Sequence, residues 1–472
     1  MAPNTFNMGD FNPRDLLPKD LMPKDLRQKV YDHMGVDPST LTIVSEQFEK
    51  YNHPNLQLAL NEISENKDNQ VTVLGLQSGF VNNITGTSLK DIISPQSFAS
   101  MVGLGGVKEG SVQYLNMDIG NGQKLACVQG ALYLIAEKGK ENMVVLLRQN
   151  SMMDFAGQSA INLDVMAKER TTAEKFVQNI QKNIRLKNVY RGKILSTSNE
   201  GGGLKFHDLP PVTRDRIILP DGLLKRIERQ TIEAGKHSEA LKKANRKLKR
   251  GILLHGRPGT GKTLTAMYLA SEMKERTVIL MTGRGQGAIE SSCRFARWLE
   301  PSMVVIEDVD LIAEDRATQQ GCNTAILLEL LNEMDGLSDD VDVLFFLTTN
   351  RPEVLEPALA ARPGRVDQAY EIPLPDKDCR KRLFDLYIKG LQVEVADMDP
   401  YIKRTQGASG AFIAEIMRKA ALFAAADGEP IVVKDNHMDE AMHELLVVGG
   451  TLTKSLLGSS EIGFTPTGFK DS

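Results

Sequence analysis

The sequence contains few cysteines and no hydrophobic run long enough to cross a membrane. Its 472 residues include four cysteines, none with a partner at metal-ligand spacing: Cys127, Cys293, Cys322 and Cys379. A chain of this length does not need disulfides, so we interpret them as buried thiols of a reducing compartment. A membrane span needs ~18 apolar residues, and the first 30 residues carry prolines and charges where a signal peptide needs an apolar core. We therefore expect a cytoplasmic protein with no membrane span.

Neither sign of charge is in large excess. Lysine and arginine together number 57 and aspartate and glutamate 61, which gives a net charge of −4. Proteins that mainly hold nucleic-acid phosphates are usually more basic. A basic run over residues 242–250 has no interleaved aromatic residue, and we interpret it as the solvated face of a helix rather than a nucleic-acid site. The composition thus argues against nucleic acid as a partner.

The chain length suggests two to four domains. Residues 1–35 contain a proline-led repeat of period five, which blocks a continuous helix, so we expect a flexible arm; docking of its leucines on a partner is the alternative. Residues 36–195 mix strand and helix periodicities and predict an α+β domain, which we assign to partner recognition. Residues 196–211 begin with a Ser/Thr/Gly-rich stretch typical of a linker, and residues 449–472 have the composition of a mobile tail.

A phosphate-binding loop is the clearest motif. A short apolar strand, Gly251–Leu254, runs into Gly256–Thr263, which reads G-x-x-x-x-G-K-T, and a helical pattern begins directly afterwards. Such a loop turns its backbone amides toward phosphates at a helix N-terminus. The residues assigned to ATP binding are Gly256, Pro258, Gly259, Thr260, Gly261, Lys262, Thr263 and Leu264.

Two further strands end in polar side chains. The strand over residues 302–306 is followed by Glu307 and Asp308, and the strand over 343–348 leads to Asn350. Ligands of parallel sheets bind at the carboxyl ends of the strands. We expect Thr263 and Glu307 to hold Mg²⁺, Asp308 to polarise the attacking water, and Asn350 to hold that water.

Two arginines, Arg362 and Arg365, follow downstream of this third strand. A guanidinium group can act as an arginine finger in the site of a neighbouring subunit, where it stabilises transition-state charge. The alternative is that both pair with local acids such as Asp367 and Glu371 and brace the fold.

The order of these motifs resembles the AAA family of ATPases within the AAA+ group. The resemblance covers about residues 212–446 and includes three further segments: LLNEMDGL at Leu330–Leu337, ARPGR at Ala361–Arg365 and GASGAFIAEI at Gly407–Ile416. It implies a P-loop α/β fold, with a large ATP-binding subdomain over residues 212–374 and a small helical subdomain over 375–448. It also implies a homo-hexameric ring with ATP and Mg²⁺ at the subunit interfaces. By position, Asn350 matches the first sensor, Arg362 and Arg365 the two fingers, and Gly410 and Ala411 the small-subdomain stretch that faces the nucleotide.

The sequence departs from the family pattern at three places. The acidic pair reads Glu307-Asp308 instead of Asp-Glu, so the two carboxylates exchange lengths. The segment Thr282–Ile289, which corresponds to the pore loop, has no aromatic residue to grip an extended chain. Tyr387 stands where the family often has a histidine near the adenine. His443-Glu444 begins like a zinc-protease motif, but Val447 replaces the second histidine, so we reject a protease of the FtsH type.

These observations leave two main hypotheses. The first is an ATP-hydrolysing ring that remodels an unidentified protein substrate selected by the N-terminal domain, which the intact sensor Asn350 and the two arginines favour. The second is a nucleotide-gated assembly scaffold with slow or vestigial hydrolysis, which the Glu-Asp order and the pore-loop sequence favour. A motor driven by nucleic acid is a third reading, and the net charge speaks against it.

Overall fold

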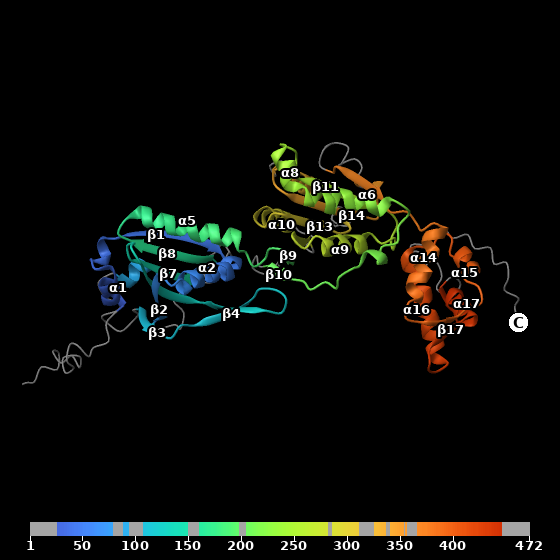
Figure 1. Cartoon of the computed structure of the whole chain (residues 1–472), viewed down its shortest axis with the longest axis horizontal. Helices are drawn as coiled ribbons and strands as arrows, with labels where there is room; N and C mark the ends of the chain where they lie inside the picture. The colour runs from blue at the N-terminus through green and yellow to red at the C-terminus, as the bar shows by residue number, and fades with distance from the viewer. Residues whose placement is uncertain are drawn as a thin grey trace, which may run out of the picture. The chain divides into compact units, whose positions relative to one another are not determined.

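The computed structural model describes residues 26–78, 88–93, 107–149, 160–197, 204–281, 286–310, 325–336, 340–353, 355 and 366–445. The chain divides into two compact units, Met1–Val189 and Tyr190–Ser472 (Figure 1). Each unit contains one large β-sheet with helices packed on it, which confirms the predicted α+β and α/β classes. Among the helices of the described ranges, none is long and apolar enough to cross a bilayer.

The first unit is built on an antiparallel sheet of order β1-β8-β7-β6-β2-β3. Its strands are β1 (Thr42–Glu49), β2 (Asn69–Ser78), β3 (Val107–Gly110), β6 (Gly130–Glu137), β7 (Met143–Gln149) and β8 (Ala160–Ala167), and a separate hairpin pairs β4 (Tyr114–Asp118) with β5 (Lys124–Val128). The helices are α1 (Leu26–Met34), α2 (His53–Glu65), α3 (Leu89–Ile93) and α5 (Arg170–Leu186). Because strand side chains alternate in direction, Leu132 and Leu134 of β6 pack with α1 and α3, while Tyr133 faces Gln57 of α2.

Helix α1 begins inside the segment that the sequence predicted to be a flexible arm. Leu26, Val30 and Met34 recur at four-residue spacing, so they form one helix face, and all three are buried in the core of the first unit. The prediction of a flexible arm over residues 1–35 is therefore wrong from Leu26 onward, where the chain forms α1. The proline-led repeat runs from Pro13 to Arg27; its last two residues begin α1, and the rest of it lies outside the described residues.

The second unit begins with a seven-stranded sheet of order β10-β9-β12-β13-β14-β11-β15. Its strands are β9 (Ile194–Thr197), β10 (Leu204–Phe206), β11 (Arg250–His255), β12 (Thr277–Met281), β13 (Ser302–Ile306), β14 (Val343–Thr349) and β15 (Gln368–Glu371). All neighbouring strands are parallel except β10 and β9. The helices of this part are α6 (Leu223–Glu228), α7 (Ala234–Lys236), α8 (Ser238–Lys243), α9 (Lys262–Glu272), α10 (Gln286–Trp298) and α12 (Ala325–Asp335).

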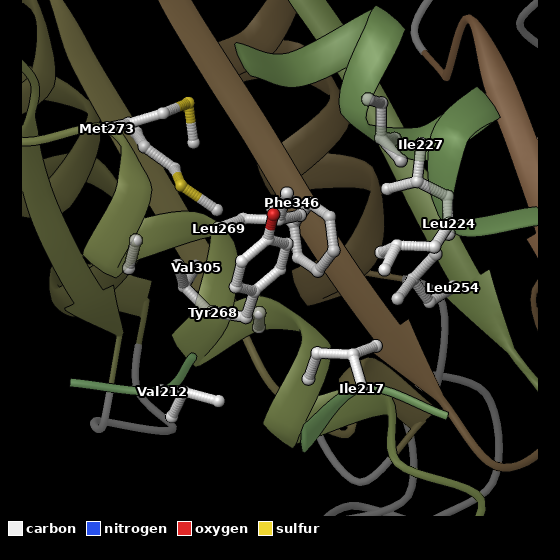
Figure 2. Close-up of a cluster of buried hydrophobic side chains, with 14 of the residues drawn as sticks. Val212, Ile217, Leu224, Ile227, Leu254, Tyr268, Leu269, Met273, Val305 and Phe346 are labelled. Atoms are coloured by element: carbon white, nitrogen blue, oxygen red, sulfur yellow. The ribbon is translucent and has the colours of Figure 1, made fainter. Parts of the chain in front are cut away.

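Helices α6 and α9 cover one face of this sheet. Leu224 and Ile227 of α6 and Leu269 of α9 belong to one buried cluster with Phe346 of β14 and Val305 of β13 (Figure 2). Helix α10 packs against β9, β12 and β13 and contacts α12. The core thus fixes the phosphate loop, which joins β11 to α9, relative to the ends of β13 and β14.

The prediction of a linker over residues 196–211 is wrong at residues 196–197 and 204–206, which belong to strands. Ser196 and Thr197 belong to β9, which pairs in parallel with β12, and residues 204–206 form β10. Both Ser196 and Thr197 are buried despite their polar side chains. Tyr190 stacks on Phe206 with ring centroids 5.4 Å apart and lies 6.1 Å from Trp298 of α10, so aromatic contacts hold the strand pair on the second unit.

The remainder of the second unit is helical, as predicted. It comprises α14 (Lys377–Ile388), α15 (Asp399–Arg404), α16 (Gly410–Ala426) and α17 (Asp435–His443), with a small parallel pair of β16 (Gln392–Glu394) and β17 (Val432–Lys434). Its core includes Phe384, Phe412, Ile416 and Met438. The predicted tail over residues 449–472 lies outside the described residues.

A buried ion-pair cluster closes the amino end of the second unit's sheet. Both terminal oxygens of Asp342 lie 2.7 Å from Nη2 of Arg276, and Nη2 of Arg250 lies 3.4 Å from its Oδ1. The side chains of Arg276 and Asp342 are 5% and 12% exposed. Arg250 is therefore paired and not part of a solvated helix face, unlike what the basic run at residues 242–250 predicted.

Replacing Asp342 with alanine should lower the free energy of unfolding of this unit by about 3–5 kcal/mol, because two buried guanidinium groups lose their partner. Urea unfolding followed by Trp298 fluorescence measures this, since Trp298 is the single tryptophan of the chain. Arg297→Ala is the matched control: its ion pair with Glu333 is 41% and 27% exposed, so less than about 1 kcal/mol should be lost. Equal losses in the two variants would contradict the cluster's structural role.

Candidate functional site

The phosphate loop forms the turn between β11 and α9, as the sequence predicted. Gly256 opens the loop, and Gly261 caps α9 with φ of +101°. A Cβ atom placed on Gly261 would meet nothing within 4 Å, so its φ, rather than a close neighbour, is what favours glycine at this position. Helix α9 begins at Lys262, and the amides of its first turn have no partner within the helix. Free amides at a helix N-terminus are the donors that a phosphate group accepts.

Lys262 is held inside this loop. Its Nζ donates hydrogen bonds to the carbonyl oxygens of Gly256 and Arg257, at 2.8 and 3.0 Å, and the residue is 6% exposed. Burial lowers the pKa of Lys262, whereas the carboxylates of Asp308 and Asp310 act to raise it. A partly desolvated ammonium group of this kind interacts strongly with an incoming anion. Thr260 lies in the same turn, where its hydroxyl donates to the carbonyl of Arg257 at 2.9 Å.

Glu307, directly after β13, lies beside the first turn of α9. Burial raises the pKa of Glu307, and the charge of Asp308 adds to this rise, while a hydrogen bond with the Thr263 side chain opposes it. The structure therefore brings together the two residues that we assigned to Mg²⁺. A carboxylate and a hydroxyl are hard oxygen ligands, and Mg²⁺ in nucleotide sites uses one or two carboxylates together with phosphates. The donor set thus fits a magnesium ion, whose positive charge would offset phosphate charge when bound.

Asp308 and Asn350 are also brought together. The side-chain Nδ2 of Asn350 donates to Oδ1 of Asp308 at 2.8 Å. Asp308 adopts φ of +46°, a left-handed conformation that aspartate tolerates better than most residues. Its backbone N–H donates to the Thr348 hydroxyl at 3.0 Å, which supports this conformation. The tips of β13 and β14 therefore fix a carboxylate and an amide in contact.

Asp310 is a site residue to which the sequence analysis gave no role. It is 2% exposed, and its Oδ1 accepts hydrogen bonds from the Thr349 hydroxyl at 2.7 Å and from the Asn350 N–H at 3.3 Å. The signal in the sequence is an acid two residues beyond Asp308. The contacts of Asp310 cannot be read from that signal, because they form only when the pairing of β13 with β14 places the two strand ends side by side.

The helical subdomain reaches the phosphate loop through the start of α16. The N–H of Ala411 donates to the carbonyl of Gly259 at 3.1 Å, and a Cβ atom on Gly259 would lie 2.8 Å from Oγ of Ser409. Gly259 also has φ of +74°, so both its conformation and its neighbours require glycine. Gly410 lies next to this contact, because its own Cβ position is 3.6 Å from the Gly259 carbonyl. The predicted pair Gly410 and Ala411 is thus adjacent to the loop.

Tyr387 of α14 packs on the hydrophobic cluster of the helical subdomain, together with Ile218. Burial raises the pKa of its hydroxyl group, against the effect of the Arg216 charge. Pro258 belongs to the same loop as Gly256, and Leu264 of α9 packs on the cluster of Figure 2. The adenine contact that we assigned to Tyr387 stays a prediction.

Arg362 and Arg365 lie outside the described residues, as do residues 282–285 of the predicted pore-loop segment, whose other four residues begin α10. One proposed local partner of the arginines is engaged elsewhere: Oδ2 of Asp367 accepts the N–H of Gly251 at 2.7 Å. Within the part of the chain that the structure describes, no group of three or more His, Cys, Asp or Glu side chains is placed to hold a metal ion.

A glycine-rich loop between a parallel strand and a helix, with a buried lysine and acids at the next strand tips, defines a P-loop nucleotide-binding domain. Residues 252–374 match the AAA family, described as the ATPase family associated with various cellular activities. The chain therefore contains an AAA ATPase domain, and its resemblance to AAA+ ATPases is confirmed.

Curated relatives support the same class. The chain is 30% identical over 253 residues to a proteasome-activating nucleotidase of Methanothermobacter thermautotrophicus, which is 50% of this chain and 61% of the relative. It is 32% identical over 250 residues to an ATP-dependent zinc metalloprotease FtsH of Nitrosococcus oceani, 50% of this chain and 38% of the relative. It is 31% identical over 248 residues to an ATPase family protein 2 homolog of Caenorhabditis elegans, 50% of this chain and 34% of the relative. The chain spans from about a third to three fifths of the length of these relatives.

Proposed function

We propose that the chain is a Mg²⁺-dependent ATPase that forms a homo-hexameric AAA ring and couples ATP turnover to remodelling of a protein partner. The observation that carries ATP hydrolysis is the convergence of Lys262, Glu307, Asp308 and Asn350 at one edge of the sheet. The relatives named proteasome-activating nucleotidase and ATP-dependent metalloprotease support an ATP-driven action on proteins. The unit Met1–Val189 would select the partner.

The described residues would divide the work as follows. Lys262 and the amides of the phosphate loop would bind the phosphate chain of ATP, and Thr263 and Glu307 would hold Mg²⁺. Asp308 would accept a proton from the attacking water, and the Asn350 amide would keep Asp308 and that water aligned. The hydrogen bond from Ala411 to Gly259 would couple the position of the helical subdomain to the conformation of the phosphate loop.

A nucleotide-gated scaffold with slow hydrolysis is the second candidate function. Two observations favour it. The shorter carboxylate, Asp308, takes the water-polarising position. The backbone of Asp308 also has a φ of +46°, which is an uncommon conformation for a residue other than glycine. Steady-state ATP turnover of the purified protein, with and without cell extract, separates the two. Turnover that rises with extract supports remodelling, whereas turnover at background in both conditions supports the scaffold.

Lys262→Ala should weaken ATP binding by at least about 30-fold, because truncating a buried, charge-paired group costs about 2–5 kcal/mol. Binding of a fluorescent ATP analogue to the purified protein measures the affinity. Lys236→Ala is the matched control, because this lysine lies on the short helix α7 and not in the phosphate loop. The affinity of the Lys236→Ala protein for the ATP analogue should be unchanged. Unchanged affinity in Lys262→Ala would remove the phosphate-loop assignment.

A further inference from the structure

We propose that Asp310 is a positioning residue for ATP hydrolysis: it holds the tip of β14 so that the Asn350 amide meets the Asp308 carboxylate. The inference rests on the proposed ATPase function of the same site. Asp310 would contact neither the nucleotide nor the attacking water. It acts through the backbone and hydroxyl groups that carry the Asn350 side chain.

The contacts of one carboxylate oxygen carry the proposal. Oδ1 of Asp310 receives both the Thr349 hydroxyl, at 2.7 Å, and the backbone N–H of Asn350, at 3.3 Å. Thr349 is fully buried, and its Oγ1 also accepts the N–H of Arg351 at 3.0 Å. Three consecutive residues at the end of β14 are therefore tied, directly or through Thr349, to one buried acid that follows β13.

The same strand tip holds Asp308 from the other side. Thr348 accepts the Asp308 N–H at 3.0 Å, and Asn350 reaches back to the Asp308 carboxylate at 2.8 Å. Asp308 therefore donates to Thr348 and accepts from Asn350, while Asp310 accepts from Thr349 and Asn350. The segment after β13 is thus bonded to the end of β14 at both acids. Because catalytic groups must be held within about 0.5 Å of their working geometry, supporting contacts of this kind affect rate more than binding.

Asp310 could have another role, as a counter-charge for Lys262. The carboxylate of Asp310 does act to raise the pKa of that lysine. The two roles depend on different properties of the side chain. Positioning needs only an oxygen acceptor, which asparagine also offers, whereas a counter-charge needs the negative charge, which asparagine lacks.

The test compares Asp310→Ala with Asp310→Asn in the full chain. For Asp310→Ala we expect kcat for ATP hydrolysis to fall about 100-fold, the scale of an ångström-sized misplacement, while the Kd of a fluorescent ATP analogue changes by less than about threefold. For Asp310→Asn we expect kcat to stay within about threefold of the starting protein. Equal losses of kcat in both variants, or a loss of ATP affinity in either, would overturn the positioning role.

Thr349 supplies a second pair of variants if Asp310→Ala does not fold. Thr349→Val removes the hydroxyl and keeps the shape of the side chain, so kcat should fall about tenfold; Thr349→Ser keeps the hydroxyl and should stay within about threefold. A full-rate Thr349→Val protein would contradict the proposal.

Crystal structures of the nucleotide-free variants give a readout that does not depend on turnover. In Asp310→Ala the Asn350 Nδ2 atom should move beyond hydrogen-bonding distance of Asp308 Oδ1, and in Asp310→Asn it should remain within it. If the starting protein hydrolyses no ATP, the proposed function fails, and these structures still decide the role of Asp310. An intact Asn350–Asp308 contact in Asp310→Ala would overturn it.

Discussion

Arg362→Ala should lower the rate of ATP hydrolysis by about 10³- to 10⁵-fold while the variant still binds ATP in its own pocket, because arginine fingers contribute that much in other P-loop enzymes. The physical reason is that charge spreads over the transferred phosphate in the transition state and a guanidinium group from the adjacent subunit stabilises it. Steady-state turnover and binding of a fluorescent ATP analogue measure the two quantities separately.

A mixing experiment decides whether the arginine acts in a neighbour. Arg362→Ala retains a sound pocket but lacks the finger, and Lys262→Ala retains the finger but lacks the pocket. Each should be inactive alone. In a mixed ring, an Arg362→Ala subunit beside a Lys262→Ala neighbour regains a complete site at that interface, so partial activity should return.

Two results would contradict this prediction. Rings shown to be mixed but still inactive would mean that Arg362 does not act between subunits. Monomers at micromolar protein concentration with ATP would remove the ring itself. Arg418→Ala serves as the control, because this arginine pairs with Glu415 at 2.7 Å on the exposed surface of α16 and its loss should cost far less activity.

Asp308→Asn should leave ATP binding intact and lower turnover by about 10²- to 10⁴-fold, the usual contribution of a general base. The asparagine oxygen can still accept the hydrogen bond from Asn350, so the local geometry should survive while the capacity to take a proton is lost. Single-turnover hydrolysis and nucleotide affinity are the measurements.

Glu307→Gln is the companion variant, because it tests the order of the two acids. We expect it to raise the Mg²⁺ concentration needed for half-maximal turnover, since an amide is a poorer ligand for a hard cation than a carboxylate. An inactive Glu307→Gln protein beside a fully active Asp308→Asn protein would show that the two roles are reversed.

The features that the sequence predicts well depend on local patterns. The phosphate loop is a strand, a glycine-rich turn and a helix within about twenty residues, and it forms as β11, residues 256–261 and α9. The acidic strand tip is equally local, because β13 is a run of buried apolar residues followed at once by Glu307. Each signal is complete before any distant contact is made.

The features that the sequence did not predict depend on pairing between distant segments. Asp310 acquires its role from Thr349 and Asn350, about forty residues away, and no local pattern announces this contact. The composition of Ser196–Thr197 indicates a linker. These residues nevertheless form part of β9, because β9 hydrogen bonds to the edge of β12 and joins the sheet. Residue type alone does not reveal which strand edge a polar segment will join.

That added strand changes where the chain can be divided. The edge of β12 that would otherwise be open is covered by β9, and β9 is covered in turn by the antiparallel β10. A fragment that began after residue 203, as the composition suggests, would retain the nucleotide pocket but lose β9, which leaves a row of unpaired amide and carbonyl groups available to other chains. The ATPase unit is therefore best separated ahead of Tyr190, because the Tyr190 ring stacks on Phe206 of β10 and belongs to the same unit.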